Sequence, residues 1–301
     1  MQSDHYCAGN SILTPCAIVV GYMIVLSTHA EVTAALREPS PVLDTATRQL
    51  RDEAHELFTG AQLDRWAHEW DPAWQSRFEA LPKHFDLIAD LAVPMGRQMA
   101  AQVCDIDDTA ALRLAPLARE LFDAESDPAN AALATSAMMS VFHDSLKVQA
   151  FAALCHTLPA FLGNAWYALL KHPVEMERLA YNPEILPGAI EELLRFAGPS
   201  LAVFRTAANG ERIKLELSKA NRDPAVFTDP GKANFKRSAA GHVAFGAGPH
   251  ACVGAALIRR AAKTPILLFA QRFTGRTVSF RPEPIETNTL RSMQNFLMRT
   301  S

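Results

Sequence analysis

The sequence predicts a mainly helical protein with a small β region. Three observations support this fold class. Helix-forming residues run almost unbroken over 47–81 and again over 128–172. The segment Cys16–Ser27 is rich in β-branched residues and is interrupted by a glycine, which suits two short strands joined by a turn. Apolar and charged residues alternate along Ile213–Leu217, a pattern typical of a half-buried strand.

The first elements can be placed in chain order. After the predicted strands we expect a helix at about His29–Leu36. A helical stretch follows over Thr47–Leu81, with Pro72 predicted as the junction between two helices. Phe85–Ala92 carries apolar residues at helical spacing. Asp127-Pro128 is typical of a helix start, because proline is tolerated in the first turn.

The later elements follow the same logic. Pro159 lies inside the next helical stretch and should kink it, since proline cannot donate to the ladder. Pro183 and Pro187 flank a turn before the helix that contains Glu192. The last long helix is expected to begin at about Val253 and, with the loop before it, to occupy about 245–272.

Composition excludes several classes of protein. The chain has 301 residues, 49% of them hydrophobic, with a formal net charge of −3 and no block of basic residues, so a nucleic-acid partner is not indicated. It is expected to form a single domain over 1–301. The five cysteines are odd in number and lack CxxC spacing, which argues against disulfides or zinc and favours a cytoplasmic location.

The apolar run Cys16–Ser27 does not predict a membrane anchor. A spanning helix needs about twenty apolar residues, and this run is shorter and broken by Gly21. No basic residues precede it, so it also fits a signal peptide poorly. We expect no membrane span.

One loop predicts chemistry. Cys252 lies in a glycine-bearing segment, Phe245–Gly254, directly before a long apolar helix. A thiolate is stabilised by backbone N–H groups pointed at its sulfur and by the positive field of a helix N-terminus. Gly248 and Gly254 would let the backbone come close. We therefore interpret Cys252 as an axial ligand of iron, against the alternative of a buried structural cysteine.

This loop resembles the heme-binding signature of the cytochrome P450 family. The matching positions are Phe245, Gly248, His250, Cys252, Gly254, Leu257 and Arg259. Two further blocks resemble the family in the same chain order, Glu192-Leu193-Leu194-Arg195 and Ala220–Phe227. The resemblance implies a helical prism with heme b (iron protoporphyrin IX) bound through Cys252.

The resemblance also implies residues around the heme. Arg51, Arg205 and His250 are the candidates for binding its propionates, with a solvated surface charge as the alternative for each. In the family the Glu-x-x-Arg pair is completed by a third basic residue. Lys232 occupies the expected stretch, although lysine cannot copy the bidentate geometry of arginine.

The side opposite the cysteine departs most from the family. Its usual small residue, glycine, any residue, acid and threonine correspond to Ala153–Thr157. Thr157 is retained, whereas His156 replaces the acid and Leu154 replaces the glycine. Thr157 and His156 are the catalytic candidates, because both can carry protons. Leu154 is expected to fill space above the iron, and a satisfied interior histidine remains the alternative for His156.

The resemblance leaves three hypotheses. The first is a heme-thiolate monooxygenase that inserts one oxygen atom into an apolar small molecule with electrons from a ferredoxin or flavoprotein reductase. The second is a peroxide-dependent or redox-neutral heme enzyme. The third is a binding or scaffold relative that serves a partner enzyme. The chain is shorter than the family norm, so a protein partner or a second copy is expected to complete an open pocket.

Overall fold

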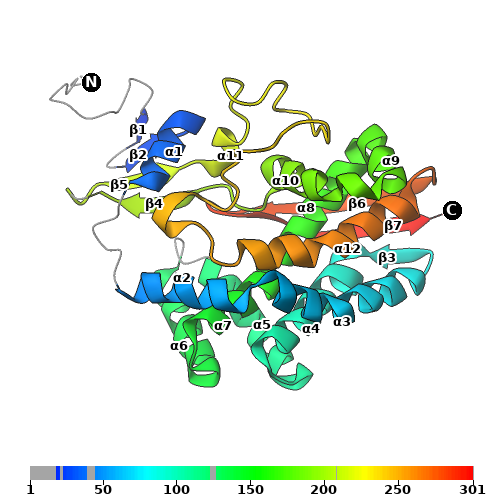
Figure 1. Cartoon of the computed structure of the whole chain (residues 1–301), viewed down its shortest axis with the longest axis horizontal. Coiled ribbons are helices and arrows are strands. Elements are labelled where there is room, and N and C mark those ends of the chain that lie inside the picture. The colour runs from blue at the N-terminus through cyan, green and yellow to red at the C-terminus, as the bar shows by residue number, and fades with distance from the viewer. Residues whose placement is uncertain (1–17, 21–22, 39–44, 123–126, 208, 301) are drawn as a thin grey trace.

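The computed structural model describes residues 18–20, 23–38, 45–122, 127–207 and 209–300. Helices make up most of this part of the chain, and two small sheets lie at separate positions around them (Figure 1). The predicted fold class, mainly helical with a small β region, is confirmed. Within these ranges, no helix is long and apolar enough to cross a membrane.

The first sheet joins the N-terminal region to the middle of the chain. Strands β1 (Ile18–Val20) and β2 (Met23–Leu26) pair antiparallel, as predicted for this segment. Strand β2 also pairs in parallel with β5 (Arg212–Leu215), and β5 pairs antiparallel with β4 (Val203–Thr206). The strand predicted over Ile213–Leu217 ends at Leu215, because the chain then enters the short helix α11 (Leu217–Ala220).

Helix α1 covers this sheet. It spans His29–Arg37, close to the predicted range, and it begins with a capping box between Thr28 and Glu31. Its Val32 and Leu36 are buried against Leu26 and Leu215 of the sheet. This small core is separate from the main one and fixes the C-terminal end of α1.

The predicted junction at Pro72 is wrong. The chain breaks between α2 (Thr45–Leu57) and α3 (Gly60–Glu79), where the hydroxyl of Thr59 accepts the N–H of Gln62 at 3.3 Å. Pro72 lies inside α3 on an exposed face. A carbonyl left without a donor there can bind water, so α3 continues through the proline.

The segment predicted as a helix from Phe85 starts as a strand. Strand β3 (His84–Asp86) leads into a π-helical turn, Leu87–Ala92, and then into α4 (Val93–Cys104). The carboxylate of Asp86 accepts N–H groups from Ile88 and Ala89 and from Phe296 of a distant strand. This tertiary contact, invisible in the sequence, draws the residues into a sheet.

Four helices follow α4, and the first three of them lie in the lower part of Figure 1. They are α5 (Asp108–Phe122), α6 (Pro128–Phe142), α7 (Ser145–Ala152) and α8 (Leu158–Lys171). The predicted start at Asp127-Pro128 is confirmed, with Asp127 as the N-cap. A π-helical turn, Ala153–Thr157, joins α7 to α8 directly before Pro159. The irregularity predicted at Pro159 is therefore present as a π turn.

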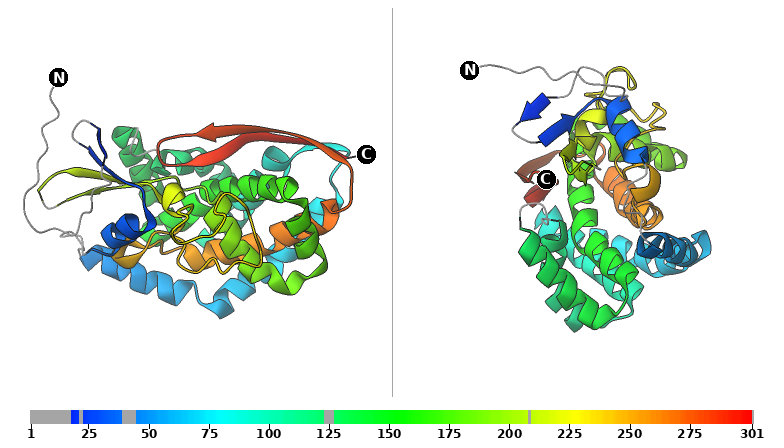
Figure 2. Two further views of the ribbon diagram at one scale, coloured as in Figure 1. Left: turned by 90° about the horizontal axis from the view of Figure 1, so that it is seen from above. Right: turned by 90° about the vertical axis from the view of Figure 1, so that its left-hand side faces the viewer.

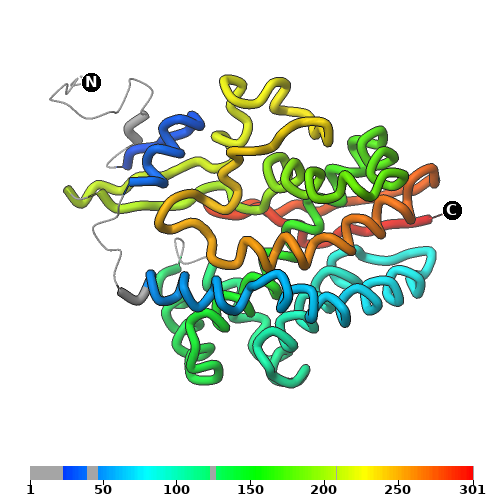
Figure 3. The backbone as a smooth tube through the Cα atoms, in the orientation of Figure 1, coloured from blue at the N-terminus to red at the C-terminus, as the bar shows by residue number. Residues whose placement is uncertain are grey.

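The remaining elements close the fold. Helices α9 (Pro173–Tyr181) and α10 (Leu186–Ala197) flank the 3-10 turn Pro183–Ile185. Helix α12 (Ala255–Phe273) runs beside α3 through the middle of the molecule (Figure 3).

A long hairpin, β6 (Val278–Glu286) and β7 (Arg291–Thr300), pairs with β3 and was not predicted. It lies along one face of the molecule in the left view of Figure 2.

Candidate functional site

A cavity of about 870 Å³ lies between the Cys252 loop and the junction of α7 with α8. Its walls come from distant segments of the chain. These include the end of α1, the α2–α3 junction, α5 to α8, residues 199–205, the loop 244–254, the start of α12 and the β6–β7 turn. Most of the lining side chains are apolar, among them Phe58, Phe161 and Ile258. A cavity of this size and character is typical of a site for a cofactor or a small molecule.

Cys252 presents its sulfur to this cavity. The side chain is exposed, and it is one of the residues that line the cavity wall. Its backbone N–H donates to the carbonyl oxygen of Phe245 at 2.8 Å, which closes the loop. The thiol is accessible through the cavity but is surrounded by protein atoms, and this desolvation raises its pKa, while the N–H of Gly254 and the charge of Arg259 act in the opposite direction. Metal coordination favours the thiolate over this burial penalty, so the position suits an iron ligand.

The loop owes its shape to two glycines. Gly246 and Gly248 both have φ of +69°, in the left-handed region that favours glycine. Gly248 also lies against the end of α1, where a Cβ atom would be 2.6 Å from the carbonyl oxygen of Leu36. At Gly254, by contrast, a Cβ atom would meet only the sulfur of Cys252, at 4.0 Å. The close approach predicted for Gly248 is present, and that predicted for Gly254 is not.

The three predicted propionate ligands divide into two groups. Arg205 and His250 line the cavity, and burial lowers the pKa of Arg205. Arg51 is outside the set of lining residues. Its Nη1 donates to the carbonyl oxygens of Pro249 and Ala251 at 2.9 and 3.2 Å, so it ties α2 to the cysteine loop.

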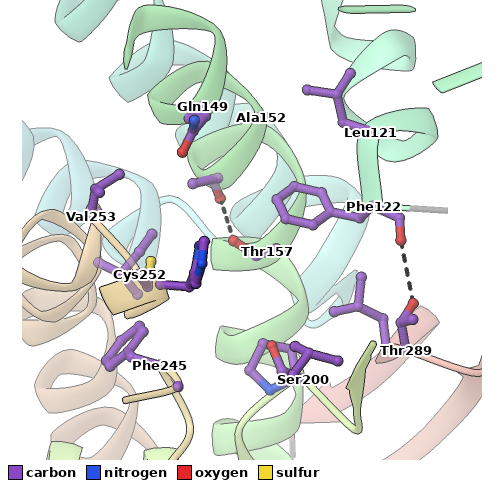
Figure 4. A pocket seen from close by; sticks show the side chains of 18 of the residues that line it. Leu121, Phe122, Gln149, Ala152, Thr157, Ser200, Phe245, Cys252, Val253 and Thr289 are labelled. Carbon is purple, nitrogen blue, oxygen red and sulfur yellow. Dashed lines mark hydrogen bonds between the residues drawn. The ribbon is translucent and has the colours of Figure 1, made fainter. Parts of the chain in front are cut away.

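Thr157 lines the cavity from the α7–α8 junction (Figure 4). Its hydroxyl donates to the carbonyl oxygen of Ala153 at 3.0 Å. Gln149 lines the same wall two helical turns earlier. Along α7 and the turn after it, the cavity is therefore lined by the hydroxyls of Ser145 and Thr157 and by the amide of Gln149, on the helical face that the i, i+4 spacing from Thr157 defines.

The expectation that Leu154 fills the space above the iron is wrong. Its side chain is fully buried, and it is not among the cavity-lining residues. The π turn sends this residue toward α4, where its carbonyl oxygen would lie 2.3 Å from a Cβ atom built on Gly96. Because α4 packs so closely here, residue 154 faces the protein core.

His156 is also absent from the cavity wall. Its ring lies against that of Phe122, with the centroids 5.7 Å apart, and Phe122 itself lines the cavity. The carbonyl oxygen of Phe122 accepts the hydroxyl of Thr289 from the β6–β7 turn at 3.3 Å (Figure 4). Phe122 and Thr289 were not predicted, because no local pattern indicates that α5 and a distant hairpin meet at this cavity.

The pair Glu192 and Arg195 is fully buried and forms two hydrogen bonds, at 2.7 and 2.8 Å. The prediction that Lys232 is the third basic residue of this network is wrong. Only its backbone carbonyl takes part, accepting from Arg195 at 3.2 Å, whereas the guanidinium of Arg237 donates to Glu192 at 3.1 Å. The arginine reaches Glu192 because the N–H of Asn234, three residues earlier, is itself bonded to that carboxylate.

Comparisons with known proteins agree with this geometry, although no family model matches the chain. Cytochrome P450 107B1 of Saccharopolyspora erythraea is 37% identical over 136 residues, which are 41% of this chain and 34% of that protein. The biotin biosynthesis cytochrome P450 of Bacillus subtilis is 35% identical over 122 residues, which are 37% of this chain and 31% of that protein. Over the matched part, the chain is similar to bacterial cytochromes P450.

A solved cytochrome P450 supports the fold over nearly the whole chain. The crystal structure of P450BioI in complex with a hexadec-9Z-enoic acid ligated acyl carrier protein superposes with a TM-score of 0.79 and 19% identity, covering 92% of each chain. The sequence matches to the curated relatives cover only about a third of the length of those proteins.

The similarity to cytochromes P450 implies a heme cofactor, and the cavity fits one. A sulfur atom in the wall, with the Gly254 N–H directed at it, supplies the axial ligand. Arg205 and His250 supply polar contacts for carboxylates, and the apolar side chains suit a flat macrocycle. The residues present therefore match the chemistry of the cofactor.

Proposed function

We propose that this protein is a b-type heme-thiolate monooxygenase that inserts one oxygen atom into an apolar small molecule. The observation that carries the proposal is the sulfur of Cys252 in the wall of a cavity of about 870 Å³. Cys252 would bind the iron, Phe245, Gly248 and Gly254 would form the loop around it, and Arg205 and His250 would contact the propionates. Arg51 would act indirectly, by holding the loop through Pro249 and Ala251.

Thiolate-ligated heme iron, when bound, supplies the chemistry of O–O bond cleavage. The protein's own part is to hold the sulfur, exclude water and deliver protons. Apolar walls exclude water from the cavity. The hydroxyl of Thr157 on the wall can pass a proton, and its bond to Ala153 orients the oxygen.

His156 has a second, indirect role in the proposal. It lies next to Thr157 in the chain, with its ring against Phe122. We assign it to proton supply behind Thr157 and expect His156→Ala to slow turnover while heme content stays at the wild-type level. Unchanged turnover would remove this role.

The decisive experiment is optical. Purified protein should show the red-shifted Soret band of a ferrous carbonyl thiolate complex, and Cys252→Ser should lose it. Cys104→Ser is the matched control, because Cys104 is buried away from the cavity wall and burial raises its pKa to about 12. Absence of the band in the wild type would contradict the proposal and leave a binding or scaffold relative.

One observation favours a second candidate, a peroxide-dependent or redox-neutral heme enzyme. Among the described residues that line the cavity, none is an aspartate or a glutamate. A proton relay sustained by a carboxylate is therefore not built into this wall. Turnover with peroxide alone would support this candidate, whereas turnover that requires ferredoxin and reductase would support the monooxygenase.

The proposed partners follow from the same chemistry. A monooxygenase of this class takes electrons from a ferredoxin or a flavoprotein reductase, and we propose such a donor here. Because the chain is shorter than the family norm, we also propose that another protein or a second copy of the chain covers the cavity. We further propose that the protein works in the cytoplasm. Size-exclusion chromatography with and without a donor protein tests the first two.

A further inference from the structure

A cluster of four side chains lies directly behind the wall that carries Cys252. Glu191 comes from α10, Arg259 from α12, and His242 and Phe245 from the loop between them and the cavity. Helix α10 therefore meets the cysteine loop and the first turns of α12 at one point. The cysteine itself is not part of the cluster. None of the roles assigned above uses Glu191 or His242, and Arg259 has entered only through the effect of its charge on the pKa of Cys252.

Arg259 is held on two sides. Its Nε and Nη2 donate to the two carboxylate oxygens of Glu191, at 2.7 and 2.8 Å. Its guanidinium also lies over the ring of Phe245, 4.7 Å from the centroid. A bidentate carboxylate pair fixes the plane of a guanidinium, and a planar cation over an aromatic face is attractive.

His242 secures the other end of the cluster. The backbone N–H of Ala244 donates to its Nδ1 at 3.2 Å, so Nδ1 is the acceptor and the ring proton is on Nε2. That N–H faces Glu191, with Nε2 of His242 3.0 Å from Oε2 of Glu191. The His242 side chain is only 6% exposed, against 32% for Glu191 and 38% for Arg259.

The cluster acts on the cavity through Phe245. The ring of Phe245 lines the cavity, and its carbonyl oxygen accepts the N–H of Cys252 at 2.8 Å. Phe245 is therefore in contact with Arg259 on one side and with the backbone of Cys252 on the other. Movement of this one residue would change both the cavity wall and the position of the cysteine.

We propose that Arg259 is a positioning residue. Held by Glu191 and His242, it clamps Phe245 and thereby fixes the loop segment 242–254 that presents Cys252 to the cavity. The inference rests on the proposed function only in taking Cys252 as the iron ligand.

The test measures backbone hydrogen exchange of the loop 242–254 in the full-length protein without heme. Hydrogen exchange of peptides that cover 242–254 should be about tenfold faster in Arg259→Gln than in the wild type, the order expected for losing a partly buried bidentate pair and a cation–π contact. Arg259→Lys keeps the charge but loses the planar fork, so its exchange should lie between the two.

Arg260→Gln is the matched control. This residue is the next on the same helix, but its guanidinium faces α3 and pairs with Asp64 and Asp71. The Arg260→Gln substitution removes the same charge from α12 but changes no contact of the cluster. Hydrogen exchange over 242–254 should therefore stay at the wild-type rate.

A double variant distinguishes a positioning role of Arg259 from a general loss of stability. Because both side chains act through one pair, exchange in Glu191→Gln/Arg259→Gln should be no faster than in Arg259→Gln alone. Additive effects in the double variant, or equal exchange in Arg259→Gln and Arg260→Gln, would overturn the proposal.

A second readout uses the heme-loaded protein. The ferrous carbonyl Soret band should shift or split in Arg259→Gln and return in Arg259→Lys. A wild type that binds no heme contradicts the proposed function and leaves the exchange result intact. Faster exchange with an unchanged Soret band would overturn the step from loop to cysteine.

Discussion

The sharpest prediction concerns the glycines of the cysteine loop. Gly248→Ala adds a Cβ atom at a residue with φ of +69°, where it would lie 2.6 Å from the carbonyl oxygen of Leu36 and 2.8 Å from Cα of Arg37. A left-handed conformation costs an L-residue about 1–2 kcal/mol. Forcing an atom into a packed site costs about 1–3 kcal/mol more. We expect the free energy of unfolding to fall by about 2–5 kcal/mol.

Two neighbouring glycines separate the two costs. Gly246 has the same φ of +69°, but an added Cβ atom has no neighbour closer than 3.8 Å, so Gly246→Ala should lose only the conformational cost of about 1–2 kcal/mol. Gly254 has φ of −87° and an open site, so Gly254→Ala should lose under about 1 kcal/mol, the effect of changing an N-cap residue.

Urea denaturation of the heme-free protein measures the series. Its midpoints should fall in the order Gly254→Ala, Gly246→Ala, Gly248→Ala, with the slopes unchanged. Heme content after expression should follow the same order, since displacement of Gly248 moves the loop that ends at Cys252. A midpoint for Gly248→Ala no lower than that for Gly246→Ala would refute the steric argument.

Four further predictions concern burial and charge. Glu192→Gln should cost about 3–5 kcal/mol of unfolding free energy, because it leaves the cation of Arg195 buried without its carboxylate. In the same urea assay Arg237→Ala should be destabilising and Lys232→Ala near neutral, and the reverse ranking would contradict the assignment of the third cation. Leu154→Ala should cost about 2–5 kcal/mol in urea without widening the cavity, as measured by unchanged affinity for large axial ligands of the heme. Arg259 and His242 lower the pKa of Glu191 from 4.5 to about 2 in the folded state, although burial acts against them. The stabilisation from this carboxylate is complete above the higher value and is lost as pH falls toward the lower one, so the difference in urea midpoint between wild type and Glu191→Gln should shrink from about pH 6 to about pH 3. A constant difference would be inconsistent with the ion pair.

The cavity wall opposite Cys252, built by Ala153–Thr157, could be predicted from the sequence only in part. The family resemblance over Ala153–Thr157 made Thr157 a catalytic candidate, and Thr157 does line the cavity; residues four apart, such as Ala153 and Thr157, share a helical face. The same spacing back to Gln149 could have added that residue. It could not reveal the π turn at Ala153–Thr157, which directs Leu154 to α4 and His156 to Phe122. Such a turn depends on the close packing of Gly96, 58 positions before Leu154 in the numbering.

Local chemistry in the sequence determined the cysteine loop, the first strands, the helix start at Asp127 and the buried pair Glu192 and Arg195. These features depend on residues within a few positions of one another, so their spacing alone specifies them. The hairpin β6–β7 and the placement of Arg51, Arg237 and Phe122 were decided only by tertiary structure. Each depends on a hydrogen bond or packing contact between segments far apart in the chain, and such contacts exist only once the fold has brought those segments together.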